Sequence, residues 1–138
     1  MKGYLLDTDV VSELRKGKRA NSNVQAWYHG VSEGDLFASV LVFGEIRSGI
    51  ERIRPNDSVQ AKALERWLKE LERLYIDRIL PITVAVADRW GRLNAGNPIS
   101  VIDGLMAATA LQNDLTLVTR KVEDVTRTGV KLLNPFEA

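Results

Sequence analysis

Four acidic residues in this sequence stand where a carboxylate needs a specific partner, and they are Asp7, Glu45, Asp103 and Asp124. Asp103 is the most informative, because no other charge lies between Arg92 and Asp114. An ionised carboxylate in so apolar a segment is unfavourable unless a cation or hydrogen bonds compensate it. Backbone amides in the first turn of a helix would also satisfy it. We favour a metal ion as the partner of Asp103.

Each of the other three acids has an ordinary structural explanation when it is taken alone. Asp7 follows the apolar run at 3–6 and is equally well placed to cap the next helix. Glu45 lies in a segment without other charges, and a partly exposed helical glutamate paired with an arginine accounts for it as well. Asp124 alone would be a solvated loop acid. The four together point to a site.

Carboxylates gathered at close range repel one another and raise each other's pKa. A hard divalent cation removes this penalty, and Mg²⁺ or Mn²⁺ suits a shell of carboxylates and water. Zinc is disfavoured, because the sequence has no cysteine and His29 is its only histidine. The residue types therefore predict a site for Mg²⁺, with Mn²⁺ as the alternative.

The predicted secondary structure can bring these acids to one place. Short apolar runs predict strands at 3–6, 36–40, 79–82, 115–119 and 131–133. Between them, apolar periodicity predicts helices at 10–16, 42–53, 85–93 and 101–113. Capping residues predict two more helices, one that begins at Asn21 or Ser22 and one that runs from Asp57 or Ser58 to 74. This alternation predicts an α/β fold with a mainly parallel sheet. In such sheets, sites lie beyond the carboxyl ends of the strands, which three of the acids closely follow.

Length and composition indicate one ordinary domain. The 138 residues, 45% hydrophobic and 27% charged, contain no repeat or linker, so we predict a single domain over 1–138. The net charge of +1 gives no bulk attraction to nucleic acid. No apolar run approaches the roughly 20 residues of a membrane span. The absence of cysteine fits a reducing cytoplasm, where we expect the protein.

Four blocks of the sequence resemble those of PIN domains, especially of the VapC and FitB toxins. They run in the family's order from Leu5 to Leu14, Ser39 to Gly49, Val101 to Ala110 and Leu117 to Asp124, with Leu133 to Phe136 as the usual ending. There are departures: Asp9 and Lys121 stand where the family usually has asparagine, and Val125 where an aromatic residue is common. Asp9 adds charge near the expected metal.

The resemblance implies a three-layer α/β/α PIN-like fold with a mainly parallel sheet. It also implies an Mg²⁺- or Mn²⁺-dependent endoribonuclease, the toxin of a type II toxin–antitoxin system, inhibited by a cognate antitoxin. A homodimer is implied as well, with operator DNA bound only through the antitoxin. The four acids would hold one or two metal ions, directly or through water, and a metal-activated water would cleave RNA.

Other polar residues are candidates for supporting roles. Thr8 and Ser12 could position water, and Thr119 could orient Asp124 or a metal-bound water, although a local cap or turn bond is the simpler explanation for each of the three. A basic cluster follows the first predicted helix and consists of Arg15, Lys16, Lys18 and Arg19. It could receive the RNA backbone or simply favour a helix C-terminus. Lys121 could meet a phosphate instead of orienting Asp124.

Three alternatives to a PIN-type nuclease are open on the sequence alone. The run from Asp7 to Val11 also matches the nucleophile motif of haloacid-dehalogenase phosphatases, which need an acidic pair beyond a further strand. Only Glu123-Asp124 and a short tail follow the last long apolar run. A receiver-type signalling domain needs a central strand ending on its acceptor aspartate, whereas Asp35 precedes its strand and Asp77 follows a helix. A non-catalytic, RNA-binding PIN relative is the third alternative.

Overall fold

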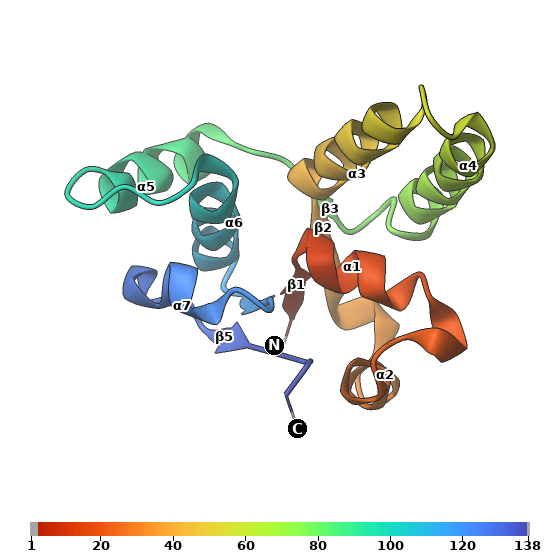
Figure 1. The fold of residues 1–138 in the computed structure, drawn as a ribbon. Helices are drawn as coiled ribbons and strands as arrows, with labels where there is room; N and C mark the ends of the chain where they lie inside the picture. Colours follow the sequence, from red (N-terminus) through yellow and green to blue (C-terminus); the bar gives the residue numbers. More distant parts are fainter. Residues whose placement is uncertain (1–2, 138) are drawn as a thin grey trace.

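A parallel sheet with helices on both faces forms the centre of the protein (Figure 1). The computed structural model describes residues 3–137. Its strands are β1 (Tyr4–Leu6), β2 (Leu36–Ser39), β3 (Ile79–Leu80), β4 (Thr116–Val118) and β5 (Leu132–Leu133). They lie in the order β3-β2-β1-β4-β5, and every neighbouring pair is parallel. The predicted α/β architecture is confirmed, with an entirely parallel sheet in the described residues.

The helices divide into two groups on opposite sides of this sheet (Figure 1). The first group is α1 (Thr8–Leu14), α2 (Ser22–His29), α3 (Val40–Ile53) and α4 (Ser58–Leu74), and the second is α5 (Val84–Asn94), α6 (Val101–Gln112) and α7 (Val122–Val125). Short 3₁₀ turns are η1 (Gly17–Arg19), η2 (Glu33–Asp35) and η3 (Thr126–Thr128). The chain moves from β1 outward to β3, then returns to β4 on the other side of β1. Right-handed crossovers in opposite directions place their helices on opposite faces, which gives three layers.

Capping residues account for the main differences between predicted and observed boundaries. Helix α1 begins at Thr8 rather than Val10, because the Asp7 carboxylate accepts the Thr8 amide and caps the helix. Helix α3 begins at Val40 rather than Val42, with Ser39 accepting the Leu41 amide at 3.0 Å. Strand β3 ends at Leu80, before a proline that cannot donate to a ladder. The four-residue helix α7 is too short to show a period, so periodicity does not predict it.

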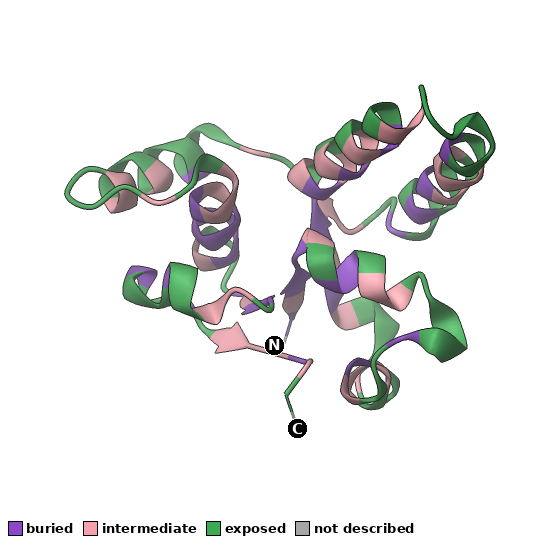
Figure 2. Ribbon diagram, in the orientation of Figure 1, coloured by how far each residue is buried: buried purple, intermediate pink, exposed green. Residues whose placement is uncertain are grey.

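The core lies along β1 and the helix faces beside it, which are purple in Figure 2. Leu5, Leu6 and Val118 are fully buried, as expected for strands covered on both faces. Met106 of α6 is also buried, at 1% exposure. No helix within residues 3–137 is long and apolar enough to cross a membrane.

Candidate active site

Asp7 is the centre of a polar network at the carboxyl edge of the sheet. It directly follows β1, and its backbone amide continues the pairing with β4 by donating to the Val118 carbonyl at 2.9 Å. The Thr119 hydroxyl donates to Asp7 Oδ2 at 2.7 Å, and the Thr8 amide donates to Oδ1 at 2.7 Å. The strands before β4 are added on one side of β1, and β4 and β5 are added on its other side, so the topological switch point lies between β1 and β4. Open α/β sheets bind ligands at the carboxyl ends of the strands at this point.

Burial leaves the charge of Asp7 incompletely compensated. The residue is only 5% exposed. Desolvation raises the pKa of its carboxyl above the ordinary value, although hydrogen bonds from Thr119 and Thr8 and the charge of Lys121 oppose the shift. A nearby cation would stabilise the ionised form of this buried carboxylate further.

Glu45 joins this network through Thr8. It lies in the second turn of α3, which begins directly after β2. The Thr8 hydroxyl donates to Glu45 Oε1, while the Thr8 amide donates to Asp7 Oδ1. One residue, Thr8, therefore links two of the predicted acids, and its role in positioning water stays a prediction.

Asp103 reaches the same edge from the opposite layer. It lies in the first turn of α6, whose chain continues into β4, so the helix runs antiparallel to the strands and starts at their carboxyl end. The Ser100 hydroxyl donates to Asp103 Oδ2 at 2.9 Å, and the Asp103 side chain is 13% exposed. In the described residues its hydrogen bonds come from side chains, not from first-turn amides. Sequence reasoning missed Ser100, although its spacing three residues before Asp103 is typical of such a pair.

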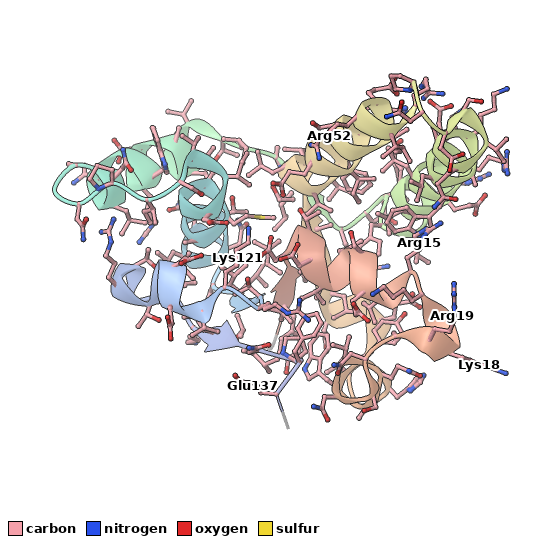
Figure 3. The ribbon with its side chains drawn as sticks, viewed as in Figure 1. Arg15, Lys18, Arg19, Arg52, Lys121 and Glu137 are labelled. Atoms are coloured by element: carbon pink, nitrogen blue, oxygen red, sulfur yellow. The ribbon has the colours of Figure 1, made fainter. Side chains whose placement is uncertain are left out.

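Lys121 supplies a positive charge between these acids. Its Nζ lies 3.5 Å from Asp103 Oδ1, and Figure 3 shows it in the middle of the molecule beside α6 and α7. Partial burial lowers the pKa of its ammonium, but the carboxylates of Asp103, Asp7 and Asp9 outweigh that effect and raise the pKa. Lys121 is therefore a charged member of the site.

Asp124 and Ser12 are not joined to this network. Asp124 lies on α7 and is exposed, and it lines a hollow of about 440 Å³ together with Lys121, Asn134 and Glu137. Its side chain lies near Lys121 but makes no hydrogen bond or ion pair with the network in the described residues. Thr119 orients Asp7 rather than Asp124. Ser12 is exposed on α1.

Within residues 3–137, no three acidic or histidine side chains are close enough to form a ready-made metal cluster. Hydrogen bonds and one ion pair thus connect three of the four acids, and the metal ligand set remains a prediction.

The oxygen donors nevertheless fit a magnesium-type ion. Mg²⁺ usually keeps several waters and is held by one or two carboxylates plus substrate phosphates. Asp7 and Asp103 provide two carboxylates that share Lys121 as a neighbouring cation. Both contribute only oxygen, which suits Mg²⁺ and Mn²⁺.

The predicted basic cluster lies apart from the acids. Arg15 packs its guanidinium over the Trp67 ring, 5.5 Å from the centroid, and Lys16 pairs with Glu13 at 3.0 Å. Lys18 and Arg19 project outward from η1, far from Lys121 in Figure 3. The basic cluster is therefore not part of the acidic network.

A close contact between α5 and α6 sets the position of Asp103. A Cβ at the buried Gly104 would lie 2.8 Å from Trp90 Cδ1 and 2.9 Å from Nε1. The indole is rigid, so α6 can approach α5 this closely only with glycine at 104. The indole Nε1 is itself buried without a hydrogen-bond partner in the described residues.

We expect Gly104→Ala to destabilise the fold by about 1–3 kcal/mol, the usual cost of overpacking a tight contact. Gly91→Ala is the matched control, because its helical position in α5 has no atom within 4 Å of the added Cβ. Alanine there should raise stability by up to about 1 kcal/mol through helix propensity. Urea unfolding of both variants measures the difference, and equal free energies of unfolding would contradict the close contact.

The chain belongs to the PIN domain family, whose sequence profile matches residues 4–123. It is 31% identical over 137 residues to Toxin FitB of Neisseria gonorrhoeae, covering 96% of this chain and 97% of that protein. It is 28% identical over 138 residues to VapC ribonuclease Y4jK of Sinorhizobium fredii, covering 96% and 97%.

Solved structures agree with this assignment. The crystal structure of FitAcB from Neisseria gonorrhoeae matches with a TM-score of 0.88 and 29% identity, over 98% of this chain and 99% of that chain. The structure of FitAB bound to an IR36 DNA fragment matches with a TM-score of 0.86 and 28% identity, over 98% and 96%. The receiver alternative is wrong, because receiver sheets have the order 2-1-3-4-5 rather than the order found here.

Proposed function

We propose that this chain is a metal-dependent endoribonuclease and the toxin of a type II toxin–antitoxin pair. The observation that carries the proposal is the connection of Asp7 to Asp103 through Thr119 and Lys121, at the carboxyl ends of β1 and β4. Two relatives that match nearly the whole chain are called a toxin and a ribonuclease. Family membership alone would also fit a non-catalytic RNA-binding protein, and the connected acids are what supports the catalytic alternative.

In this proposal Asp7 and Asp103 hold Mg²⁺ or Mn²⁺, and Glu45 and Asp124 act directly or through metal-bound water. The ion, when bound, lowers the pKa of a water and stabilises charge on the phosphate. Thr8 fixes Glu45 through Oε1, and no protein hydrogen bond in the described residues engages Oε2. Glu45 Oε2 is thus able to accept a hydrogen bond from the attacking water. Thr119 holds Asp7 in place, and no nucleophilic side chain is required.

The partners follow from the same relatives and from the resemblance. We propose RNA as the substrate, a cognate antitoxin as the inhibitor, a homodimer as the assembly, and operator DNA as a ligand reached only through the antitoxin. The structure of FitAB on DNA concerns a protein similar over nearly its whole length. Co-expression with the reading frame beside the gene tests the antitoxin assignment.

The test of the function uses purified protein, an internally labelled single-stranded RNA and the matched DNA. We expect cleavage of RNA within the strand in Mg²⁺ or Mn²⁺, loss of cleavage in excess EDTA, and recovery when metal is restored. Undiminished cleavage in EDTA would contradict the metal-dependent mechanism. Binding of RNA without cleavage under every metal condition would favour the non-catalytic alternative.

For RNA binding, we expect Lys18→Ala combined with Arg19→Ala to weaken affinity and flatten its salt dependence. Losing two phosphate contacts to single-stranded RNA should reduce the slope of log K against log salt by about 1.4. Lys62→Ala with Lys69→Ala, on the exposed side of α4, is the matched control. Filter binding in EDTA at several salt concentrations measures the slope. An unchanged slope would make Lys18 and Arg19 ordinary solvated surface.

A further inference from the structure

Lys121 is the only basic side chain that forms an ion pair with a predicted site acid in the described part of the chain. The remaining ion pairs there involve none of the four predicted site acids; one example is Arg92 with Asp88. Lys121 is also, with Asp9, one of the two positions where the sequence departs from the asparagine that the resemblance to PIN domains implies. Its place among the acids therefore calls for an explanation specific to this chain.

The site itself fixes the backbone of Lys121. The Lys121 amide donates to Thr119 Oγ1 at 3.0 Å, and the same hydroxyl donates to Asp7 Oδ2. Thr119 is 1% exposed, so the hydroxyl that anchors the Lys121 amide lies inside the protein, while the Lys121 side chain itself is 40% exposed. The side chain then reaches across to α6, where its ammonium meets Asp103 at 3.5 Å. The Thr119 hydroxyl that orients Asp7 thus also holds the backbone from which the Lys121 side chain extends.

The charges around this ammonium do not balance without another cation. Lys121 carries one positive charge, and the carboxylates of Asp103, Asp7 and Asp9 act on it. Glu45 adds a fourth carboxylate through Thr8. Like charges gathered at one edge of the sheet destabilise the metal-free site, even though no three of the described acids lie close enough together to form a metal cluster. The ammonium of Lys121 relieves part of this repulsion by pairing with Asp103. Asp103 is also one of the carboxylates that a divalent ion would bind.

We propose that the Lys121 ammonium is the built-in counter-cation of the metal-free site and competes with the divalent ion for Asp103. The inference rests on the metal-dependent function proposed above. It has two consequences of opposite sign. Lys121 stabilises the protein without metal, and it lowers the affinity of the site for metal. A lysine that only filled space or braced the turn would not produce the second effect.

The experiment removes the charge and keeps the rest of the residue. Lys121→Gln and Lys121→Met are two neutral variants that retain the stem and the amide to Thr119. Lys121→Arg keeps the charge. Lys131→Gln is the matched control, because Lys131 is an exposed lysine before β5 whose ion pair, with Asp114 at 3.7 Å, lies outside the site. Isothermal titration with Mn²⁺ alone gives Kd, and thermal melts in EDTA give the stability of the metal-free chain.

We expect the neutral variants to bind Mn²⁺ at least about tenfold more tightly, as removal of a unit charge a few ångströms from a divalent ion predicts. The same variants should melt at a lower temperature in EDTA. Lys121→Arg and Lys131→Gln should stay near wild type in both measurements. If one neutral variant does not fold, the other is used.

Two results would overturn the inference in distinguishable ways. If wild type binds Mn²⁺ and the neutral variants bind it equally or more weakly, Lys121 does not compete with the metal, and the proposed function stands. If wild type binds no Mn²⁺ and cleaves RNA in EDTA, the metal-dependent function fails, and this inference fails with it.

Discussion

Replacing Asp103 with asparagine is expected to lower RNA cleavage by a factor of about 100 or more while the fold stays intact. The amide preserves the shape of the side chain and can still accept from Ser100, but it has no charge to hold a divalent ion. Initial rates on labelled RNA in Mg²⁺ measure the loss. Circular dichroism and the melting temperature in EDTA show whether the fold is kept.

Asp88→Asn is the matched control for this substitution. Asp88 lies on α5, where its exposed side chain pairs with Arg92 at 2.9 Å, outside the network. Its variant should cleave RNA at the wild-type rate. Wild-type turnover by Asp103→Asn would remove Asp103 from the active site, whatever its hydrogen bonds.

The substitution Asp7→Asn should leave the metal-free protein as stable as wild type, or more stable. Asparagine caps helices as well as aspartate does, so α1 keeps its cap. The neutral amide also avoids the cost of burying a charge, a cost shown by the raised pKa of Asp7. The variant should, however, lose the stabilisation that Mg²⁺ gives. A ligand at 100 times its Kd stabilises a protein by about 2.7 kcal/mol, so the lost shift is easily measured.

Thermal melts of wild type, Asp7→Asn and Asp88→Asn, each in EDTA and in Mg²⁺, test this expectation. Wild type and Asp88→Asn should both gain stability in Mg²⁺. Equal metal-induced shifts in wild type and Asp7→Asn would show that Asp7 serves only as a helix cap and not as a metal ligand.

Parallel topology explains why sequence reasoning can place Asp7 and Glu45 at the same edge of the sheet. Asp7 follows β1, Glu45 lies one turn beyond the start of the helix after β2, and a parallel sheet puts both strand ends at one edge. Asp103 can be found because its carboxylate interrupts an apolar helix. The order of the strands is beyond such reasoning, since short apolar runs carry no information on which neighbour they pair with.

The contacts that connect the acids are hidden in the sequence because they are non-local. Thr119 and Asp7 are 112 residues apart, and a single sequence does not reveal that their side chains meet. The contact of Trp90 with Gly104 is equally hidden, since an apolar helix with one glycine has many possible neighbours. The sequence predicts a loop at Asp124 because α7, the helix that carries it, has only four residues and shows no apolar period.

The orientation of the Lys121 side chain is another feature that the sequence alone does not reveal. Its position after Thr119 suggests contact with a phosphate or with Asp124. The turn fixed by the Thr119 hydroxyl instead sends the ammonium to Asp103. Which acid a lysine meets depends on the turn that carries it, and that turn forms only once β1 and β4 are paired.

The most direct test of the central claim is the anomalous signal of Mn²⁺ in a crystal of the wild-type protein. We expect a peak between the carboxylates of Asp7 and Asp103, at the carboxyl edge of β1 and β4. Oxygen atoms of at least one of these residues should lie about 2.0–2.3 Å from it, with waters completing the shell. A strong Mn²⁺ peak elsewhere, with none beside Asp7 or Asp103 at saturating metal, would contradict the metal centre on which the proposed ribonuclease depends.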